Sequence, residues 1–457
     1  MHIPDQFNFV EQLFKQSANH LFDTALIDTT QTWTYQELET RVKSLSTWLT
    51  NLGVRPEERV AIVLKDSADT VAILLAVMYS GMVAVPIDPR SSLTNIRYCL
   101  DHSGARLVIK ENDLEISGVD KTDMCDQYSH ELARAYLSHR DSACVFMYTS
   151  GTTGHPKAVV HRHATPYIIG TQGGKSIGFT KIDRSYSAAK LFYSFGMFNL
   201  WNTLFAGAST VLHPGIFIPN TISSLLVEHR VTLTIMVPVL YSKMLEQNLD
   251  GHCLRLCLAG ADKLPDATHF QWHKKTNVFI QNIYGSTEIG AACLHNVGSA
   301  PPSSIGKPIP GYQVKIVDNQ LWIKASTAGL FYWHNKYWSE KQFSEWMPTG
   351  DIVNKDAQGN YYFLGRVSDV VKVNGNYVDL GKIEQAVMSV PGVQEAVVIG
   401  KTDKLGHARL KSYIVTVPTQ EVTSVDILKH VKEFEIIDQL PRTETGKIQR
   451  YKLRDRM

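Results

Sequence analysis

The stretch YTSGTTGHPKAVVHR, residues 148–162, is the least ordinary run in the chain. Small polar residues fill its first half, Pro156 and Lys157 follow, and apolar residues come next. Glycine, serine and threonine offer backbone N–H groups and hydroxyls with little bulk, so a loop of them can wrap a polyphosphate while one lysine neutralises it. The stretch therefore predicts a phosphate-holding loop between apolar strands. Its candidate ligands are Thr149, Ser150, Gly151, Thr152, Thr153, Gly154 and Lys157.

This spacing differs from that of a P-loop NTPase. The P-loop needs a glycine, four residues, and then Gly-Lys-Ser/Thr, whereas Gly154 is followed by His155 and Pro156. The run GGKS at residues 173–176 has the right ending, but Ile169 occupies the place of its earlier glycine. We interpret that run as a surface loop. An ordinary polar turn remains the alternative for residues 149–157.

Composition and charge narrow the class of protein. The chain has 457 residues with 44% hydrophobic content, so it can bury a large core, and its length predicts roughly two to four domains. The net charge of +2 points to neither nucleic acid nor an acidic partner. The six cysteines lack metal-ligand spacing, which favours buried reduced thiols in a cytosolic protein.

Neither a signal peptide nor a membrane span is expected. The N-terminus lacks a basic start followed by an apolar core. The apolar run 70–87 is interrupted by Ser80, Gly81 and Pro86, and a span needs about 20 apolar residues. We predict instead a buried helix, a turn at Gly81 and a buried strand. The expected location is the cytoplasm, with no membrane partner.

Short apolar strands alternate with helical patterns through the first two-thirds of the chain, which favours an α/β fold with largely parallel sheets. Apolar residues at helical spacing from Leu38 to Leu52 predict one such helix, which Gly53 ends. From about Pro308 the pattern becomes that of an antiparallel hairpin with its turn at residues 318–319. A boundary near residues 364–387 divides the chain into domains 1–366 and 367–457.

Further polar stretches carry candidate binding groups. In NIYGSTEIG, residues 282–290, Tyr284 could stack on a base, Thr287 could bond a phosphate and Glu288 could hold Mg²⁺. PTGDIV supplies Asp351, whose carboxylate suits ribose hydroxyls, and FLGRVSDVVKVNG supplies Arg366. LPRTETGKIQR places Lys447 in a glycine-containing loop. The alternatives are a strand-end turn for residues 284–288, an Asx turn at Asp351, and a solvated side chain for Lys447.

These five stretches, in this order, resemble the adenylate-forming superfamily of acyl-CoA synthetases, peptide-synthetase adenylation domains and luciferases. The resemblance covers nearly the whole chain. Residues 187–212, GSTE and LPRTETGKIQRYKLR are most similar to benzoate-CoA ligase and related aryl- or acyl-acid ligases. The resemblance implies a large N-terminal domain of stacked α/β layers with a small barrel-like part. A small α+β C-terminal lid domain would complete the fold.

The resemblance also implies a two-step reaction with ATP and Mg²⁺. A carboxylate attacks the α-phosphate of ATP and expels pyrophosphate, and the acyl adenylate then reacts with a thiol. The loop with Thr152 and Lys157 would hold the β- and γ-phosphates, Glu288 would bind Mg²⁺, and Lys447 would stabilise the charge developing at the α-phosphate. The implied nucleotide contacts elsewhere are Gly260, Ala261, Tyr284, Gly285, Ser286, Thr287, Asp351 and Arg366.

The acid pocket follows from the same resemblance. Amino-acid-activating relatives place an aspartate where this chain has Gly196, so an ammonium would lie there unpaired and a free α-amino acid is not the expected substrate. Three residues before Gly196 is the position of the family's gate residue, where relatives often have histidine and this chain has Tyr193. The apolar side chains around this position predict a pocket for an aryl or medium-length acyl acid. The alternative is that the residues of this pocket are simply core residues. The pocket residues are Tyr193, Phe195, Gly196, Ile289, Gly290 and Ala291.

The acceptor thiol stays open between two alternatives. KVNG, with Lys372 and Gly375, resembles the family loop that lines the pantetheine tunnel, which serves both coenzyme A and a carrier-protein phosphopantetheine. At the expected hinge the family has Asp or Lys and this chain has Ser368, which puts the domain rotation in doubt. A non-catalytic nucleotide-binding regulator is the alternative of another class. The intact Lys157, Glu288, Asp351 and Lys447 argue against that regulator.

Overall fold

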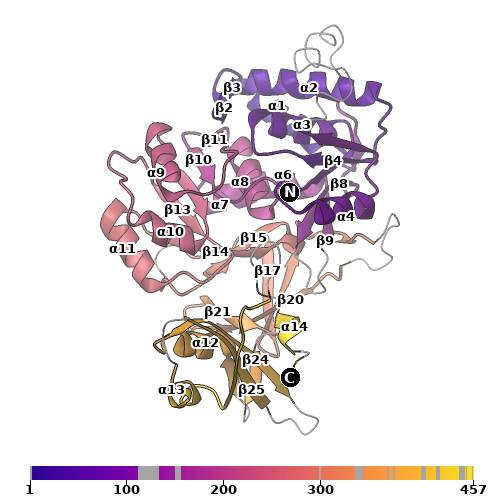
Figure 1. Ribbon diagram of the computed structural model, residues 1–457. Coiled ribbons are helices and arrows are strands. Elements are labelled where there is room, and N and C mark those ends of the chain that lie inside the picture. The colour runs from indigo at the N-terminus through magenta and orange to yellow at the C-terminus, as the bar shows by residue number, and fades with distance from the viewer. Residues whose placement is uncertain are drawn as a thin grey trace.

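Two layered sheets with their helices form the larger part of the fold, and a smaller α+β unit follows at the C-terminus (Figure 1). The computed structural model describes residues 3–111, 133–149, 156–297, 300–334, 343–367, 370–373, 376–402, 408–417, 422–441, 448, 450–454 and 456. Within this part the expected α/β class, with a large N-terminal domain and a small C-terminal domain, is confirmed.

The larger sheet has nine strands in the described part of the chain, in the order β16-β15-β14-β13-β12-β10-β11-β2-β3. From β14 across to β2 the neighbours run parallel, as the alternating pattern predicts. The carboxyl ends of β10, β13 and β14 therefore meet at one edge. The strands are β2 (Thr24–Ile27), β3 (Thr32–Thr34), β10 (Arg184–Ser187), β11 (Ser209–Val211), β12 (Leu233–Met236), β13 (Leu256–Ala259), β14 (Ile280–Ser286), β15 (Ala291–His295) and β16 (Lys307–Pro308).

The second sheet has the order β19-β9-β8-β5-β4-β6 among described residues. Its pair β8–β9 is antiparallel, with Thr149 opposite Lys157, so residues 150–156 connect two paired strands. This setting differs from the strand-to-helix setting of a P-loop. The strands are β4 (Arg59–Val63), β5 (Val83–Pro86), β6 (Leu107–Lys110), β8 (Ala143–Thr149), β9 (Lys157–Arg162) and β19 (Phe331–Tyr332).

Helices on these sheets form the main core. α3 (Ala68–Tyr79) is apolar on all sides, and its side chains are almost fully buried between α2 and the rest of the core. α2 (Tyr35–Asn51) begins with a capping box: the Glu37 N–H donates to Thr34 Oγ1 and the Thr34 N–H donates to the Glu37 carboxylate. The other helices of this part are α1 (Phe9–Ser17), α4 (Leu93–Ser103), α6 (Ala164–Ile168), α7 (Gly174–Ile177), α8 (Ser194–Phe205), α9 (Pro219–Glu228), α10 (Pro238–Met244) and α11 (Asp266–Thr276).

One local expectation is wrong. The run GGKS at residues 173–176 is helical, because it joins a π-helical turn at Ile169–Gly173 to α7. Gly174 packs so closely on Asn202 of α8 that a Cβ there would lie 2.6 Å from the Asn202 Oδ1. Close helix packing, rather than a surface loop, accounts for Gly174.

A small antiparallel sheet follows, in the order β17-β18-β20-β21. Its first hairpin turns at Asp318 and Asn319, both with positive φ, as the predicted turn requires. β20 and β21 pair so that Asp351 lies opposite Arg366. The strands are β17 (Tyr312–Val317), β18 (Gln320–Ala325), β20 (Met347–Lys355) and β21 (Tyr361–Arg366).

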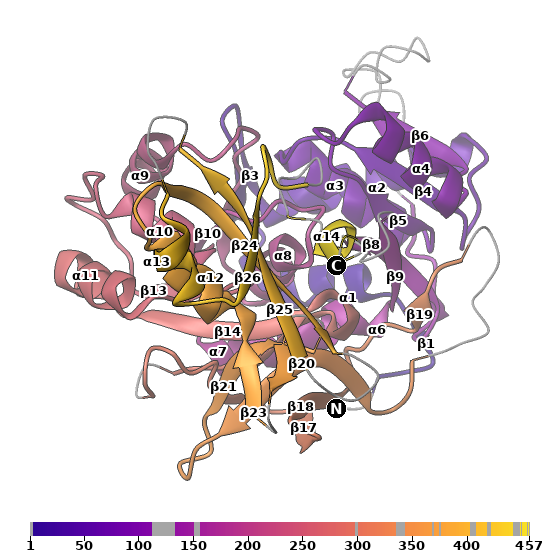
Figure 2. The same ribbon diagram turned by 60° about the horizontal axis from the view of Figure 1, so that its bottom comes forward.

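The strands after β21 pair only with one another in the described part of the chain. They are covered by α12 and α13, and the unit lies at one end of the larger part (Figure 1). Figure 2, in which this unit comes forward, shows β24, β25 and α14 in front of the larger part. Its elements are β22 (Val370–Val373), β23 (Asn376–Asp379), α12 (Leu380–Met388), β24 (Val393–Thr402), β25 (Ala408–Thr416), α13 (Ser424–Leu428), β26 (Glu433–Ile436) and α14 (Arg450–Arg454).

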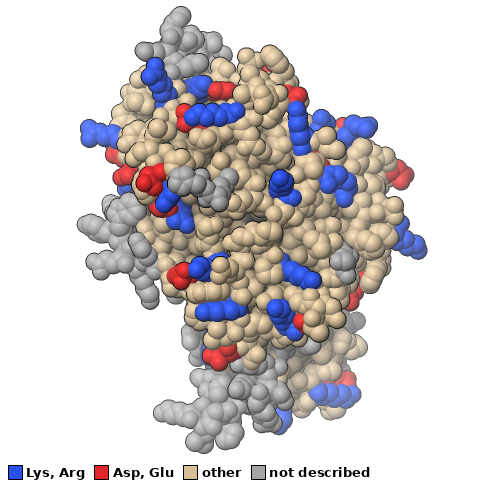
Figure 3. Space-filling model, turned by 180° about the vertical axis from the view of Figure 1, so that it is seen from behind, with Lys and Arg blue, Asp and Glu red and all other residues tan. Residues whose placement is uncertain are grey.

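The surface carries mixed charge. On the face shown in Figure 3, lysine and arginine side chains are dispersed among acidic and uncharged ones rather than gathered into one basic patch. Among described residues, no helix combines the length and the apolar content that crossing a membrane requires.

Candidate functional site

The edge where β13 and β14 end carries the first group of predicted residues. Gly260 and Ala261 follow β13 directly, and Tyr284 lies near the end of the neighbouring β14. Ala261 has φ of 70°, a backbone conformation that residues other than glycine rarely adopt. Ligands of open α/β sheets bind at the carboxyl ends of the strands. The predicted nucleotide contacts therefore lie at the edge where a ligand is expected.

Tyr284, Asp351 and Arg366 form one cluster that a hydrogen bond and an ion pair hold together. The Tyr284 hydroxyl donates to Asp351 Oδ2 at 2.5 Å, and the Arg366 Nε lies 2.8 Å from Asp351 Oδ1. Burial raises the pKa of Tyr284 well above its usual value, and the Asp351 charge adds to this effect. Tyr284 therefore stays a neutral donor. The sequence predicted all three residues, and the structure brings them together.

Glu288 lies in a second cluster with Tyr332 and Lys157. The Tyr332 hydroxyl donates to Glu288 Oε1 at 2.7 Å, and the Lys157 Nζ lies 5.7 Å from the centre of the Tyr332 ring. Burial, followed by the nearby Glu288 charge, raises the pKa of Tyr332, so its hydroxyl keeps its proton. The candidate metal ligand and the lysine of the phosphate loop thus meet at one tyrosine.

Sequence reasoning missed Tyr332. The short strand β19, which carries it, pairs with β9 so that Tyr332 lies opposite Val159, two residues after Lys157. The sequence around residue 332 contains no pattern that predicts this pairing. An isolated tyrosine is found in many core and surface environments, so no local signal could have identified it.

The turn that presents Glu288 is held from several sides. His161 Nε2 donates to the Thr287 carbonyl at 2.8 Å, and burial lowers the pKa of His161 to about 4, which keeps its ring neutral. The Gly329 N–H donates to the Glu288 carbonyl at 2.9 Å, and Thr327 Oγ1 donates to the Ile289 carbonyl at 2.7 Å. These bonds fix the backbone on both sides of Glu288.

Gly290 is required by close packing at the end of this turn. Its φ is 82°, and a Cβ there would lie 2.8 Å from the Thr327 carbonyl oxygen. The side chain of Thr287 shares a hydrogen bond of 3.1 Å with Ser194, the first residue of α8. Ile289 is 1% exposed and packs in the core next to the small antiparallel sheet, which agrees with the core alternative, and its place in the acid pocket stays a prediction.

The predicted acid pocket is only partly brought together. The Phe195 ring lies against Gly260, because a Cβ built on Gly260 would be 2.6 Å from Phe195 Cε1. Tyr193 is 42% exposed at the start of α8. A Cβ on Gly196 would lie 2.1 Å from the Lys190 carbonyl oxygen. Close approach of the backbone thus leaves no room for a side chain at residue 196, and the place of Gly196 in the acid pocket stays a prediction.

Other predicted residues stay predictions. Thr149 ends β8 opposite Lys157, Gly285 and Ser286 end β14, and Lys372 lies in β22 opposite Tyr377. The residues that lie outside the described part of the chain are Ser150, Gly151, Thr152, Thr153, Gly154, Ser368, Gly375 and Lys447, together with the side chains of Ala291 and Lys372.

The donor set at Glu288 suits Mg²⁺ bound together with a polyphosphate. Mg²⁺ prefers oxygen ligands and is usually held by one or two carboxylates plus substrate phosphates. In the described residues, no group of three or more His, Cys, Asp or Glu side chains could hold a metal ion by itself. Glu288 therefore fits as a single protein ligand.

Comparison with known proteins identifies the relatives of this chain. Residues 13–322 match the family model of AMP-binding enzymes, and residues 382–447 match that of the AMP-binding enzyme C-terminal domain. A 4-hydroxybenzoate–CoA/benzoate–CoA ligase of Rhodopseudomonas palustris is 30% identical over 94% of this chain and 90% of its own length. A benzoate–CoA ligase of Thauera aromatica is 29% identical over 99% and 96%.

A solved structure has the same fold throughout. An anthranilate CoA ligase in complex with anthranoyl-AMP superposes with a TM-score of 0.83 and 29% identity. The superposition covers 99% of this chain and 98% of that one. The match extends over both the larger part and the C-terminal unit.

Proposed function

The chain belongs to the family of AMP-binding enzymes, and we propose that it activates an aromatic carboxylic acid with ATP and transfers the acyl group to coenzyme A. One observation carries the proposal. Two clusters, Tyr284–Asp351–Arg366 and Lys157–Tyr332–Glu288, are built around one turn, residues 284–288. The first has the chemistry to bind ribose hydroxyls, and the second has the chemistry to bind a metal-bound polyphosphate.

The first half-reaction transfers the adenylyl group. The substrate carboxylate oxygen forms a bond to the α-phosphorus of ATP, the bond to the bridging oxygen breaks, and pyrophosphate leaves with that electron pair. Mg²⁺ supplies neutralising charge on the phosphates when it is bound. Lys157 adds a cation at the β- and γ-phosphates, and the Asp351 carboxylate holds the ribose in place. Such catalysis is mostly positioning and electrostatic stabilisation.

The second half-reaction forms the thioester. The thiolate attacks the acyl carbonyl carbon of the mixed anhydride, and AMP leaves. We assign the lid role to residues 367–457, with Ser368 at the hinge, Lys447 at the α-phosphate during the first step, and Lys372 and Gly375 beside the pantetheine arm. Residues 150–154 complete the phosphate loop.

The substrate class rests on the relatives and on one contact. The similar ligases are named for benzoate, hydroxybenzoate and anthranilate. The Phe195 ring against Gly260 provides an apolar wall next to the nucleotide edge. The ring of an aromatic acid fits this apolar wall better than an acid that carries a second charged group. A carrier-protein phosphopantetheine remains the alternative acceptor, and we place the enzyme in the cytoplasm.

The test is pyrophosphate release measured with a panel of acids. We expect release with benzoate and its hydroxy or amino derivatives, and none with α-amino acids or without acid. Adding coenzyme A should then yield the aryl thioester, whereas a phosphopantetheinylated carrier protein should not be acylated. Nucleotide binding without acid-dependent pyrophosphate release would support the regulator alternative and reject the proposal.

A further inference from the structure

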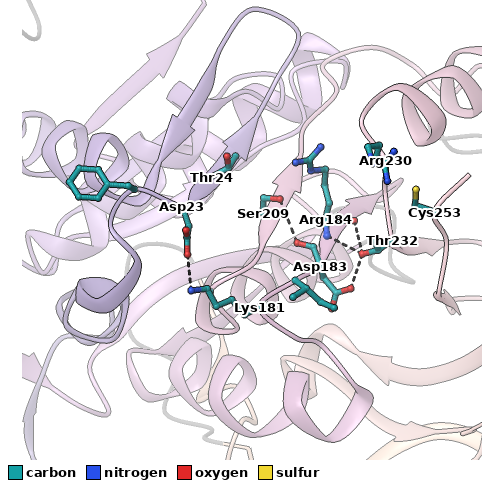
Figure 4. Close-up of a pocket in the computed structure, with 12 residues that line it drawn as sticks. Asp23, Thr24, Lys181, Asp183, Arg184, Ser209, Arg230, Thr232 and Cys253 are labelled. Carbon is teal, nitrogen blue, oxygen red and sulfur yellow. Dashed lines mark hydrogen bonds and ion pairs between the residues drawn. The ribbon is translucent and has the colours of Figure 1, made fainter.

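A second cavity lies at the opposite edge of the nine-stranded sheet. Its volume is about 660 Å³, and it is bordered by the residues that begin or precede β2, β11, β10 and β12 (Figure 4). The candidate site described above lies where strands of the same sheet end. The two sites are therefore separated by the length of the strands, and the nucleotide site does not account for this cavity.

The carboxylates of the cavity are already neutralised. Asp183 is fully buried and accepts hydrogen bonds from Thr180, Thr232 and Arg255. Burial by itself would raise the pKa of Asp183, but the hydrogen bonds from Arg255, Thr232 and Thr180 outweigh it, so the pKa is lowered. Asp23 pairs with Lys181 at 2.8 Å, left of centre in Figure 4. Neither carboxylate is left to balance another cation.

Two arginines of the same cavity have no carboxylate partner in the part of the chain that the structure describes. Arg184 donates from Nη1 to the His229 carbonyl at 2.7 Å. Among the residues that the structure describes, neither Arg184 nor Arg230 forms an ion pair. Arginine guanidinium groups bind phosphates through several N–H donors at once. The cavity therefore presents a net positive charge of two guanidinium groups.

Arg230 also occupies a backbone position that is unfavourable for arginine. It follows α9 with φ of 50°, and the hydrogen bonds Arg230 N–H to Val227 O and Val231 N–H to Leu226 O form a Schellman cap. Glycine is the usual residue at this left-handed position, because other residues adopt it at a cost in free energy. Helix capping alone would favour glycine here, so capping does not explain the arginine.

The rest of the cavity wall offers hydroxyl and apolar groups. Thr24 and Ser209 lie in its wall, and Phe22 and Ile182 line it while remaining 80% and 84% exposed. Large apolar side chains that stay this exposed beside a charged cavity are suited to contact an apolar part of a ligand. A cavity of this volume is within the range of small-molecule sites.

We propose that this cavity binds an organic phosphate, with the phosphate on Arg184 and Arg230 and an aromatic or aliphatic part against Phe22 and Ile182. Two guanidinium groups match the charge of a phosphate monoester better than that of a single carboxylate. The site is independent of the adenylation reaction. It is a place where a phosphorylated metabolite could be held by the enzyme without occupying the nucleotide edge.

Cys253 provides a local reporter, because it lines the cavity and is half-buried, whereas the other described cysteines are buried. The rate of its alkylation by N-ethylmaleimide is followed by mass spectrometry of the Cys253 peptide, with phenyl phosphate, inorganic phosphate or phenol present. We expect phenyl phosphate to slow alkylation at least about threefold, and more strongly than either fragment, because both halves of the site are then occupied. Equal protection by inorganic phosphate alone would reject the organic ligand.

Arg230→Gly is the decisive variant. It should abolish the protection by phenyl phosphate while leaving the melting temperature unchanged or raised, because glycine suits the left-handed cap. Arg184→Gln should weaken binding of phenyl phosphate by about tenfold. The double variant Asp23→Asn/Lys181→Gln removes one ion pair from the same cavity without changing its net charge, and it should keep the protection. Protection of Arg230→Gly equal to that of the wild type would overturn the proposal.

Discussion

The hydroxyl of Tyr332 donates a hydrogen bond of 2.7 Å to Oε1 of Glu288, across 44 positions of sequence. The same ring lies below the Lys157 ammonium. One oxygen of the candidate Mg²⁺ ligand is therefore already oriented before any ligand arrives. This orientation reduces the cost of arranging the carboxylate when the metal and the polyphosphate bind.

Tyr332→Phe should test this orienting role. The substitution keeps the ring near Lys157 and removes only the donor to Glu288. We expect the Mg²⁺ concentration for half-maximal pyrophosphate release to rise by about threefold to tenfold, which corresponds to roughly 0.7–1.4 kcal/mol, the usual worth of one such hydrogen bond. The melting temperature should change little.

Tyr362→Phe is the matched control, because Tyr362 also donates to a carboxylate, Asp356, at 2.9 Å in a part-buried setting. It should leave the Mg²⁺ dependence unchanged. If Tyr332→Phe and Tyr362→Phe behave alike, the bond to Glu288 has only a structural role.

Gly260→Ala should disturb the proposed acid pocket through Phe195. The new methyl group would lie 2.6 Å from the far edge of the Phe195 ring and 3.0 Å from the Ile283 carbonyl oxygen, so the ring must move. We expect KM for benzoate to rise by about tenfold with a smaller change in KM for ATP. Adding Phe195→Leu should recover part of the loss, as a double-mutant cycle would measure.

Gly173→Ala serves as the control for adding a methyl group, since its nearest neighbour would be at an ordinary 3.7 Å. It should leave both KM values unchanged. Additive losses in Gly260→Ala/Phe195→Leu would show that the two residues do not meet at the substrate.

Local signals predicted much of the fold. The apolar spacing led to α2, and the Asp318–Asn319 turn led to the β17–β18 hairpin, because turn chemistry and periodicity act over a few residues. The run 70–87 likewise became α3, a turn at Gly81 and β5. These elements needed no long-range information.

Long-range packing decided what the sequence could not predict. Tyr332 joins Glu288 only because β19 pairs with β9. The close approach of the Lys190 backbone to Gly196, which leaves no room for a Cβ, likewise has no local signature. The cluster of Tyr284, Asp351 and Arg366 was predicted as three separate motifs, and the pairing of β20 with β21 supplied one of its contacts.

Acid should destabilise the fold through buried histidines. Burial lowers the pKa of His161, His163 and His295 to about 4, below the value near 6.5 of an unfolded chain. The unfolded state then binds more protons between these values, so the stability present above about pH 6.5 is lost as pH falls toward 4. Each residue contributes up to about 1.4 kcal/mol per pH unit in this window.

His163→Leu should reduce this sensitivity. Neither ring nitrogen of His163 has a hydrogen-bond partner in the described part of the chain, so leucine removes no such bond. Melting temperatures measured between pH 7.5 and pH 5 should fall less steeply with decreasing pH in this variant. The reduction should match the uptake of about one proton fewer on unfolding. Replacing the exposed His430 by leucine should not alter the slope. An unchanged slope in His163→Leu would mean that the residue is protonated in the folded state.

α14 starts at Arg450, three residues after Lys447. Glu384, buried in α12, accepts hydrogen bonds from both terminal nitrogens of Arg450, at 2.5 and 2.9 Å, and one from the Val398 N–H at 2.8 Å. This carboxylate ties α14 to the body of the C-terminal unit. Hydrogen bonds to charged groups contribute about 1.5–3 kcal/mol, and the partial exposure of Arg450 reduces that figure.

Glu384→Gln should therefore loosen the anchor that follows Lys447. We expect adenylate formation to fall by about tenfold, while thioester formation from pre-made acyl adenylate stays nearly unchanged, because Lys447 is assigned to the first step alone. Lys447→Ala should show the same selectivity with a larger loss. Glu433→Gln, which breaks the exposed pair with Arg409 in the same unit, should affect neither half-reaction. Equal losses in both half-reactions of Glu384→Gln would indicate general destabilisation of the C-terminal unit rather than a displaced lysine.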